Sequence, residues 1–329
     1  MNKPSKPVLA ECLSARTVAV VGHGSQGSAW AANLTDTGVR VVVALRGGDA
    51  SASAGAARGA GHRVVSLEEA AAEADVFCML TPDETHPGLI AGALAGMRAG
   101  SAVVFAHGYN VHFERVQIAA GVDVVLVAPK GVGPAVRRTY VEGSGVAGLI
   151  GVARDASGGA WALAEALAEA LGCGRAGVYR SSFREETEAD LFSEQALLCG
   201  GVPSLVRAGF DLLVSRGIAP EVAYFECLHE LKLITDLMAE RGVAGMFDRI
   251  STTAKFGAAW GGDRVVDAGL KARLGAIHDD IASGAFARAL DAETGAGMPR
   301  VAAARAGWEA SQIEQVGRAV RRRMQGMDS

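Results

Sequence analysis

The sequence predicts an α/β fold in which a doubly wound parallel sheet is followed by an all-helical region. The first observation is a series of short apolar, β-branched runs separated by helical stretches, within residues 17–127. The second is a glycine-rich turn between the first run and the first helix. The third is that the strand pattern fades after Gly177 and apolar helices follow. We therefore expect one domain over 1–182 and a helical domain over 183–329.

The first predicted unit consists of a strand at 17–21, a helix over 28–34 and a strand at 39–45. The turn between strand and helix contains Gly22, His23, Gly24, Ser25, Gln26 and Gly27. In this context a GxGxxG segment is typical of a dinucleotide-binding Rossmann domain. Its glycines allow the backbone to approach a pyrophosphate, and the helix N-terminus attracts the anion. A purely structural glycine turn is the alternative.

Three further strands are predicted at 75–80, 101–105 and 123–127. Because ligands of open α/β sheets bind at the carboxyl ends of strands, the loops after these strands are candidate site segments. The first loop contains four candidate cofactor contacts, Leu80, Thr81, Pro82 and Asp83. The other two loops contain His107 and Lys130, which we predict to be catalytic, although a lone His or Lys in a loop is commonly just solvated.

The residues after the second strand bear on the choice of cofactor. Arg46 stands where an NAD-preferring domain usually has an acidic residue for the ribose hydroxyls. Arg46 can pair with a 2′-phosphate, and Ser51 and Ser53 can donate hydrogen bonds to it. Asp49 opposes this, because a carboxylate repels a phosphate and suits a free 2′-hydroxyl. We expect NADP(H), with NADH as the alternative.

The helical half carries two acidic pairs at i,i+4 spacing, Asp190 with Glu194 and Glu226 with Glu230. On a helix this spacing puts both carboxylates on one face, where they repel each other unless a cation lies between them. Both segments are otherwise apolar, and oxygen ligands of this kind suit Mg²⁺. Two solvated helix faces are the simpler alternative. Two such pairs downstream of a nucleotide-binding signature favour a metal site.

Bulk properties narrow the class of protein. The formal net charge of −4 argues against nucleic acid or an anionic membrane as the main partner. No apolar run is expected to reach the roughly 18 residues of a membrane helix, and the start of the chain lacks a signal-peptide core. The five cysteines show no CxxC spacing, so we interpret them as free thiols. We expect a cytoplasmic protein that acts on a small molecule.

Over nearly its whole length the chain resembles ketol-acid reductoisomerases of the short, class I type. The resemblance lies in the segments 24–27, 105–108, 128–131, 136–143, 185–192, 194–195 and 223–232. It implies a Rossmann domain and an all-helical, knotted C-terminal domain. It also implies conversion of 2-acetolactate or 2-aceto-2-hydroxybutyrate to 2,3-dihydroxy acids in valine and isoleucine biosynthesis.

The resemblance further implies a site with two Mg²⁺ ions. Asp190 would bridge both ions and Glu194 would bind one of them. Glu226 and Glu230 would reach the other ion from the neighbouring subunit, so the active unit would be a homodimer or a higher homo-oligomer with shared sites. Metal ions suit the reaction, because an alkyl shift requires a deprotonated tertiary hydroxyl beside a polarised ketone.

Other residues match positions with known roles in the family. Ser251 matches the residue that holds the substrate carboxylate, His107 matches the active-site residue, and Gly133 matches a cofactor contact. We expect Glu194 to shuttle the proton and Lys130 to steady a ligand oxygen.

The chain departs from the family pattern mainly around the cofactor and the substrate, not at the four acids. The departures are His23 for an aromatic residue, Asp49 for a serine, Val132 and Pro134 in the Lys-Gly run, Lys255 for a glutamate and Ala258 for an acidic residue. They motivate a second hypothesis, a specialised paralogue of a secondary pathway that acts on a different 2-keto acid. A third is a dinucleotide-binding sensor without catalytic activity.

Overall fold

The computed structural model describes residues 12–47 and 50–324. The chain folds into two compact units, Met1–Ala189 and Asp190–Ser329. The division falls within one continuous helix, α9 (Phe183–Ser193), whose first two turns belong to the first unit.

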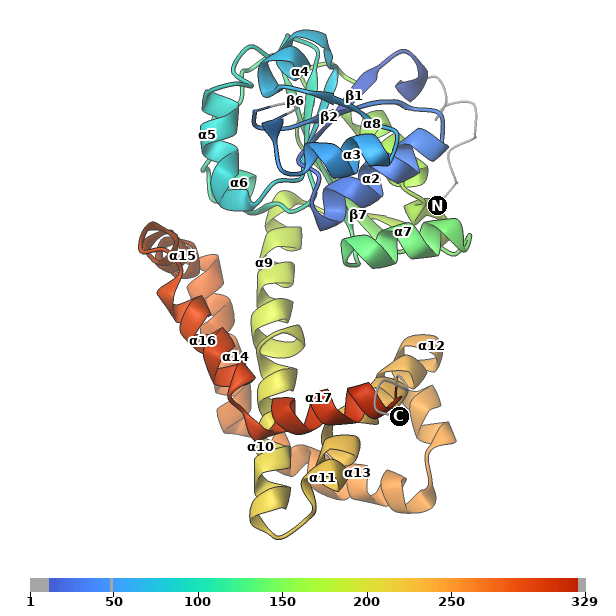
Figure 1. Ribbon diagram of the computed structural model, residues 1–329, viewed down its shortest axis with the longest axis vertical. Coiled ribbons are helices and arrows are strands. Elements are labelled where there is room, and N and C mark those ends of the chain that lie inside the picture. The colour runs from blue at the N-terminus through green and yellow to red at the C-terminus, as the bar shows by residue number, and fades with distance from the viewer. Residues whose placement is uncertain (1–11, 48–49, 325–329) are drawn as a thin grey trace. The chain divides into compact units, whose positions relative to one another are not determined.

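The first unit is built on an eight-stranded sheet with the order β3-β2-β1-β4-β5-β6-β7-β8 (Figure 1). The strands are β1 (Thr17–Val21), β2 (Arg40–Ala44), β3 (Arg63–Val65), β4 (Val76–Met79), β5 (Ala102–Phe105), β6 (Asp123–Pro129), β7 (Gly148–Arg154) and β8 (Val178–Arg180). Neighbouring strands pair in parallel except β6 and β7, which are antiparallel. The order reverses at β1, so the prediction of a doubly wound, largely parallel sheet is confirmed.

Helices cover both faces of this sheet because side chains alternate along each strand. The helical elements of this unit are α2 (Ser25–Asp36), α3 (Ala54–Gly59), α4 (Leu67–Glu73), η2 (Asp83–Thr85), α5 (His86–Ala91), α6 (Tyr109–His112), α7 (Gly133–Val141), α8 (Ala160–Ala170) and η3 (Cys173–Arg175). Val18 and Val20 of β1 belong to the core under α2, α3 and α8, whereas Ala19 and Val21 belong to the core under α4 and α5.

The predicted strands all exist, within one or two residues of their predicted ends. Three strands were not predicted. β3 and β8 have three residues each, too few to show a period, and β7 begins with Gly148 and contains Gly151, which weaken its apolar pattern. The expected first helix is longer than predicted and begins at Ser25, inside the glycine turn itself.

The second unit is entirely helical in its described residues, as predicted (Figure 1). After α9 its elements are η4 (Glu194–Leu198), α10 (Gly201–Ser215), α11 (Pro220–Tyr224), η5 (Phe225–His229), α12 (Leu231–Arg249), α13 (Thr252–Val265), α14 (Ala268–Ala282), α15 (Ala285–Gly295), α16 (Pro299–Glu309) and α17 (Gln312–Met324). Its main buried cluster is small and joins α10, α11 and α17 through Phe210, Tyr224, Ile313 and Val320. Many large apolar side chains of this unit are exposed in the single chain.

We expected no segment long and apolar enough for a membrane helix, and this expectation is wrong, because one helical stretch has the required length and composition. The helical stretch 183–215 meets that test, and little of its apolar window is buried in the single chain. Its first residue, Phe183, packs in the core of the first unit against Phe105, and polar residues such as Glu186 follow. One helix of this kind is weak evidence for a membrane protein.

Candidate functional site

A buried carboxylate, Glu186, organises the carboxyl ends of β5 and β6. One of its oxygens accepts hydrogen bonds from His107 Nδ1 at 3.0 Å and from the backbone nitrogen of Gly108 at 2.8 Å. The other accepts from Lys130 Nζ at 2.8 Å. The side chain of Glu186 is 1% exposed. The two residues predicted from the ends of these strands are therefore brought together by a third residue, which was not predicted as part of the site.

The start of α9 explains why Glu186 lies there. Ser182 and Glu185 form a capping box, since the hydroxyl of Ser182 accepts from Glu185 N and the carboxylate of Glu185 accepts from Ser182 N, both at 3.1 Å. Phe183 anchors the first turn in the core. Gly108 permits the close approach, because a Cβ there would lie 2.7 Å from Phe183 O.

The electrostatics keep Glu186 ionised. Burial by itself would raise the pKa of Glu186, but the hydrogen bond from His107 and the positive charges of His107 and Lys130 outweigh it and lower this pKa to about 2. Since Nδ1 of His107 donates to the carboxylate, Nε2 is the ring nitrogen that can contact other groups. The cluster thus holds an ammonium group and an imidazole in fixed orientations beside one anion.

Asp190 lies one turn beyond Glu186 on the same helix, so helix geometry alone keeps the two carboxylates close. Ligand atoms of His107, Glu186 and Asp190 lie within 4.8 Å of one another. Carboxylate oxygens fit a hard divalent cation. Among the described residues, Glu194, Glu226 and Glu230 belong to no such group.

The two predicted acidic pairs lie at π-helical turns. Glu194 is the first residue of η4, and η5 contains Glu226 and ends immediately before Glu230. The prediction of regular α-helices for these segments is therefore wrong in detail, because a π-turn is wider and changes the angle between side chains four residues apart. Single π-turns occur often at functional sites.

The cofactor-contact candidates largely line one cavity of about 440 Å³. The predicted residues in its wall are Gly22, His23, Gly24, Arg46, Ser51, Ser53, Leu80, Thr81 and Pro82. Gly22 has a φ of +101°, and a Cβ there would lie 2.9 Å from Leu80 O. A Cβ on Gly27 would lie 2.2 Å from Gly22 O. Gly22 and Gly27 are thus required by close backbone packing, whereas a Cβ on Gly24 would meet no heavy atom within 4 Å.

The remaining candidate residues among those that the structure describes do not line this cavity. Ser25 and Gln26 form the first turn of α2, and Gly133 begins α7 against Ser25. Asp49 lies outside the described residues. Ser251 is the N-cap of α13, where its hydroxyl accepts from Ala254 N at 3.1 Å.

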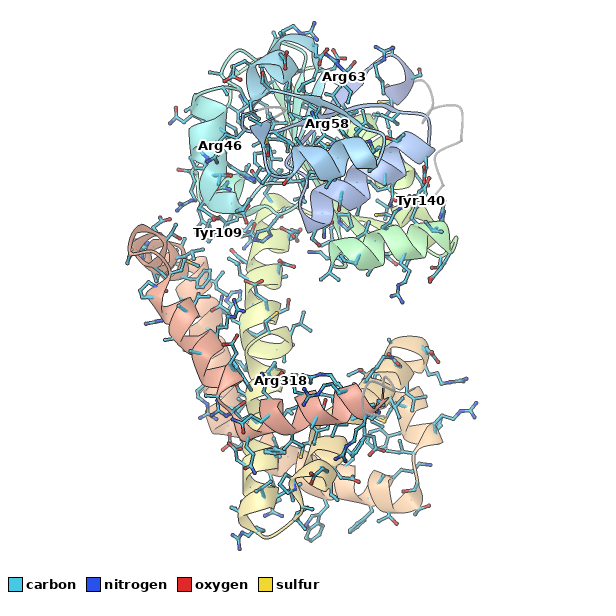
Figure 2. The ribbon with its side chains drawn as sticks, viewed as in Figure 1. Arg46, Arg58, Arg63, Tyr109, Tyr140 and Arg318 are labelled. Atoms are coloured by element: carbon cyan, nitrogen blue, oxygen red, sulfur yellow. The ribbon has the colours of Figure 1, made fainter. Side chains whose placement is uncertain are left out.

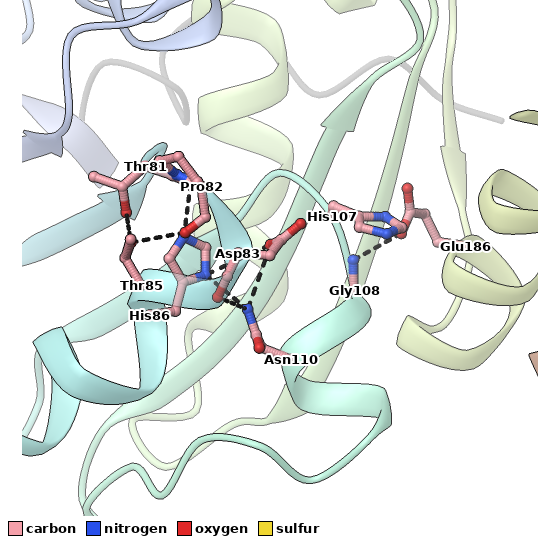
Figure 3. A network of polar contacts seen from close by, with 9 residues as sticks. All are labelled: Thr81, Pro82, Asp83, Thr85, His86, His107, Gly108, Asn110 and Glu186. Carbon is pink, nitrogen blue, oxygen red and sulfur yellow. Dashed lines mark hydrogen bonds and ion pairs between the residues drawn. The ribbon is translucent and has the colours of Figure 1, made fainter. Parts of the chain in front are cut away.

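Two buried residues that the sequence did not indicate hold the loop after β4 (Figure 3). Asn110 Nδ2 donates to Asp83 O at 2.9 Å and contacts His86 Nδ1 at 3.0 Å. His86 Nε2 contacts Thr81 O at 3.0 Å, so the neutral ring donates through Nε2 and accepts through Nδ1. Burial lowers the pKa of His86 and raises that of Asp83.

The cavity suits a dinucleotide on two counts. Nε2 of His23, which lines the cavity, is buried without a hydrogen-bond partner among the described residues. The N-termini of α2 and α7 meet there, since a Cβ on Gly133 would lie 1.9 Å from Ser25 O. Two helix N-termini side by side favour a bound pyrophosphate.

Comparisons with known proteins agree with this geometry. Residues 12–177 match the family described as "Acetohydroxy acid isomeroreductase, NADPH-binding domain", and residues 183–326 match "Ketol-acid reductoisomerase, C-terminal domain". An NADH-preferring ketol-acid reductoisomerase from an uncultured archean is 38% identical, with a TM-score of 0.91, over 94% of this chain and 95% of that chain.

A more distant structure shares the fold alone. It is a semialdehyde dehydrogenase NAD-binding protein from Cupriavidus necator, 18% identical with a TM-score of 0.60, over 82% of this chain and 99% of that chain. None of these comparisons favours the specialised paralogue. The family matches and the 38% identical structure show that the chain belongs to the ketol-acid reductoisomerase family, whose members are nicotinamide-dependent oxidoreductases of branched-chain amino-acid biosynthesis.

Proposed function

We propose that this family member is a Mg²⁺-dependent enzyme that converts 2-acetolactate or 2-aceto-2-hydroxybutyrate to the 2,3-dihydroxy acid, in the cytoplasm. The observation that carries this proposal is the cluster of Lys130, His107 and Glu186, with Asp190 one helical turn away. Residues 1–182 would bind the cofactor, and residues 183–329 would supply most of the metal and substrate contacts.

Asp190, Glu194, Glu226 and Glu230 would hold two Mg²⁺ ions, because the donor set consists of carboxylate oxygens alone. When bound, the ions supply Lewis acidity that polarises the ketone and lowers the pKa of the adjacent tertiary hydroxyl. The metal ligands would come from α9, η4 and η5, and from Glu230 directly after η5.

Side chains of this protein would transfer the proton, stabilise the developing charge and bind the substrate. Glu194 would accept the hydroxyl proton and return it after migration. Lys130, held by Glu186 at 2.8 Å, would present its ammonium group to an oxygen that becomes negative during the alkyl shift. Ser251 would hold the substrate carboxylate through its hydroxyl. His107 would orient a neighbouring group through Nε2, since Nδ1 is engaged by Glu186.

We propose NADPH as the preferred cofactor. Arg46, Ser51 and Ser53 line the same cavity as the fingerprint turn, so one cation and two hydroxyls could meet a 2′-phosphate. The archean relative prefers NADH, and this similarity favours NADH as the alternative cofactor. A higher kcat/KM with NADPH than with NADH would support the proposal. An NADH preference that is lost in Asp49→Ser would overturn it.

We also propose a homodimer, or a higher homo-oligomer, with shared active sites. Large apolar side chains of the second unit are exposed in the single chain, including Leu205, Leu212, Phe256 and Trp260. So large an uncovered apolar surface fits an interface between subunits. Glu226 is also exposed, in keeping with a ligand that completes a partner's site.

Mixed dimers test the shared site directly. Asp190→Asn and Glu226→Gln should each be inactive alone. In a hybrid of the two variants, one site combines both substitutions and the other site is intact. Random assembly of equal amounts should therefore restore about a quarter of wild-type activity. Hybrids without activity would show that both acidic pairs serve the same subunit's site.

The activity itself is tested with purified protein, Mg²⁺, NADPH and 2-acetolactate, by following cofactor oxidation. Asp190→Asn should abolish turnover while NADPH binding persists, and Glu68→Gln, an exposed acid on α4, is the matched control. Wild-type protein that binds NADPH but turns over none of the family substrates would contradict the proposal and favour the sensor hypothesis.

A further inference from the structure

A side-chain hydrogen bond joins the fingerprint turn to the loop that carries Lys130. Gln26 Nε2 donates to Gly131 O at 2.8 Å, across 105 positions of sequence. A carbonyl can only accept, so the nitrogen of the amide must face Gly131. The other end of the same amide, Oε1, is buried without a hydrogen-bond partner among the described residues.

The helices behind these two loops are locked to each other. Arg137 Nη1 of α7 donates to Asn33 Oδ1 of α2 at 2.8 Å and pairs with Asp36 of α2 at 2.6 Å. At the helix starts, a Cβ on Gly133 would lie 1.9 Å from Ser25 O, so no side chain separates the two backbones. A displacement of the fingerprint turn is therefore transmitted to the start of α7.

The Lys130 loop is held from its other side as well. The backbone nitrogen of Lys130 donates to Ala147 O at 2.8 Å, and its Nζ donates to Glu186 at 2.8 Å. Gly131, the next residue, is the one that Gln26 holds. Ala147, Glu186 and Gln26 thus all hold this segment, and Gln26 does so from the cofactor side.

We propose that Gln26 is a positioning residue, which fixes Gly131 O and so keeps the Lys130 amine in place relative to a bound dinucleotide. The backbone of the turn meets the cofactor phosphates, whereas the Gln26 side chain points to the Lys130 loop. A ligand that orders the turn then also orders Lys130. The inference rests on the proposed function, because it takes Lys130 as part of the active site.

Gln26→Met tests this role, because methionine has a similar length and cannot donate a hydrogen bond. We expect kcat to fall by about ten-fold, the size expected for one lost hydrogen bond in a positioned site, with the Kd for NADPH changed by less than about three-fold. Ser28→Ala is the matched control, since it removes a hydroxyl of the same helix that donates to Ser25 O, within its own turn. Gln26→Glu has the same size and cannot donate, so it serves if the methionine variant does not fold.

Two measurements distinguish a loss of Lys130 positioning from a general loss of structure in Gln26→Met. In a Lys130→Met background, Gln26→Met should lower kcat by less than about two-fold, since coupled residues are not additive. Acetylation of Lys130, followed by peptide mass spectrometry, should slow several-fold when NADPH binds to the wild type but not to Gln26→Met. Lys232, Lys255 and Lys271 are internal controls in the same digest.

The outcomes are distinct. Equal losses in the wild-type and Lys130→Met backgrounds, or a loss that appears wholly as weaker NADPH binding, would overturn the proposal. Unchanged NADPH protection of Lys130 in Gln26→Met would also overturn it. If wild-type protein fails to turn over substrate, the proposed function fails, whereas the acetylation experiment still reports whether Gln26 holds Lys130.

Discussion

Replacing Glu186 by glutamine should destabilise the first unit by about 3 kcal/mol at neutral pH. The carboxylate is 1% exposed and accepts from Gly108 N, His107 and Lys130. Its pKa falls from 4.5 to about 2 on folding, which corresponds to about 3 kcal/mol in favour of the ionised form. Glutamine keeps one acceptor oxygen, but it turns an N–H group toward a donor and leaves Lys130 without its anion.

The same substitution makes a prediction about pH. Because the pKa of Glu186 is lowered in the folded protein, its stabilisation is complete above about pH 4.5 and is lost as pH falls through about 2. The stability difference between wild type and Glu186→Gln should therefore be constant from pH 7 to pH 5. By pH 3 it should shrink to less than half.

Urea unfolding of both proteins, in the presence of a chelator and at several pH values, measures this difference. Comparing the two proteins at each pH cancels the acid sensitivity of carboxyl groups remote from Glu186, whereas Asp83, whose pKa is raised by burial and in smaller part by Glu186, still contributes to the difference. A difference below about 1 kcal/mol at pH 7, or one that does not shrink toward pH 3, would refute the reasoning. A difference below about 1 kcal/mol would mean that the cost of burying Glu186 offsets its ion pairs. A difference that does not shrink toward pH 3 would mean that Glu186 is not the group that titrates.

Three further substitutions test the packing around the site. Gly133→Ala places a Cβ 1.9 Å from Ser25 O and should cost at least about 2 kcal/mol, visible as a lower Tm together with weaker NADPH binding. Asn33→Ala leaves Leu171 O without its donor at 3.2 Å and should lower the free energy of unfolding by about 2 kcal/mol, measured by urea titration. Ser66→Ala removes the capping box of α4 and should cost about 1 kcal/mol, with faster amide exchange in its first turn and no change in kcat. An unchanged Tm for Gly133→Ala would contradict the inferred helix contact.

Much of the first unit could be predicted because its signals are local. The β-branched run at 17–21 and the glycine turn after it are neighbours in sequence, and the sheet rule then placed His107 and Lys130 at one edge. Glu186 was overlooked because its partners are 56 and 79 positions away. One signal could have found it, since it lies four residues before Asp190 on the same helix.

Two contacts of aromatic side chains also show the difference between local and long-range interactions. Tyr109 in α6 stacks on His107, and Arg175 lies over the ring of Tyr140 in α7 (Figure 2). The first contact is local, because His107 and Tyr109 are near neighbours in sequence. The second joins residues 35 positions apart, so it depends on the tertiary fold.

The sequence by itself determined the fold class, the position of the fingerprint turn and the family, because periodicity, turn chemistry and long motifs are properties of neighbouring residues. Only the tertiary structure decided that Glu186 joins His107 to Lys130, that His86 and Asn110 hold the loop after β4, and that Gln26 reaches Gly131. The physical reason is that a hydrogen bond needs two groups within about 3 Å, and chain folding, not spacing along the sequence, brings these groups together.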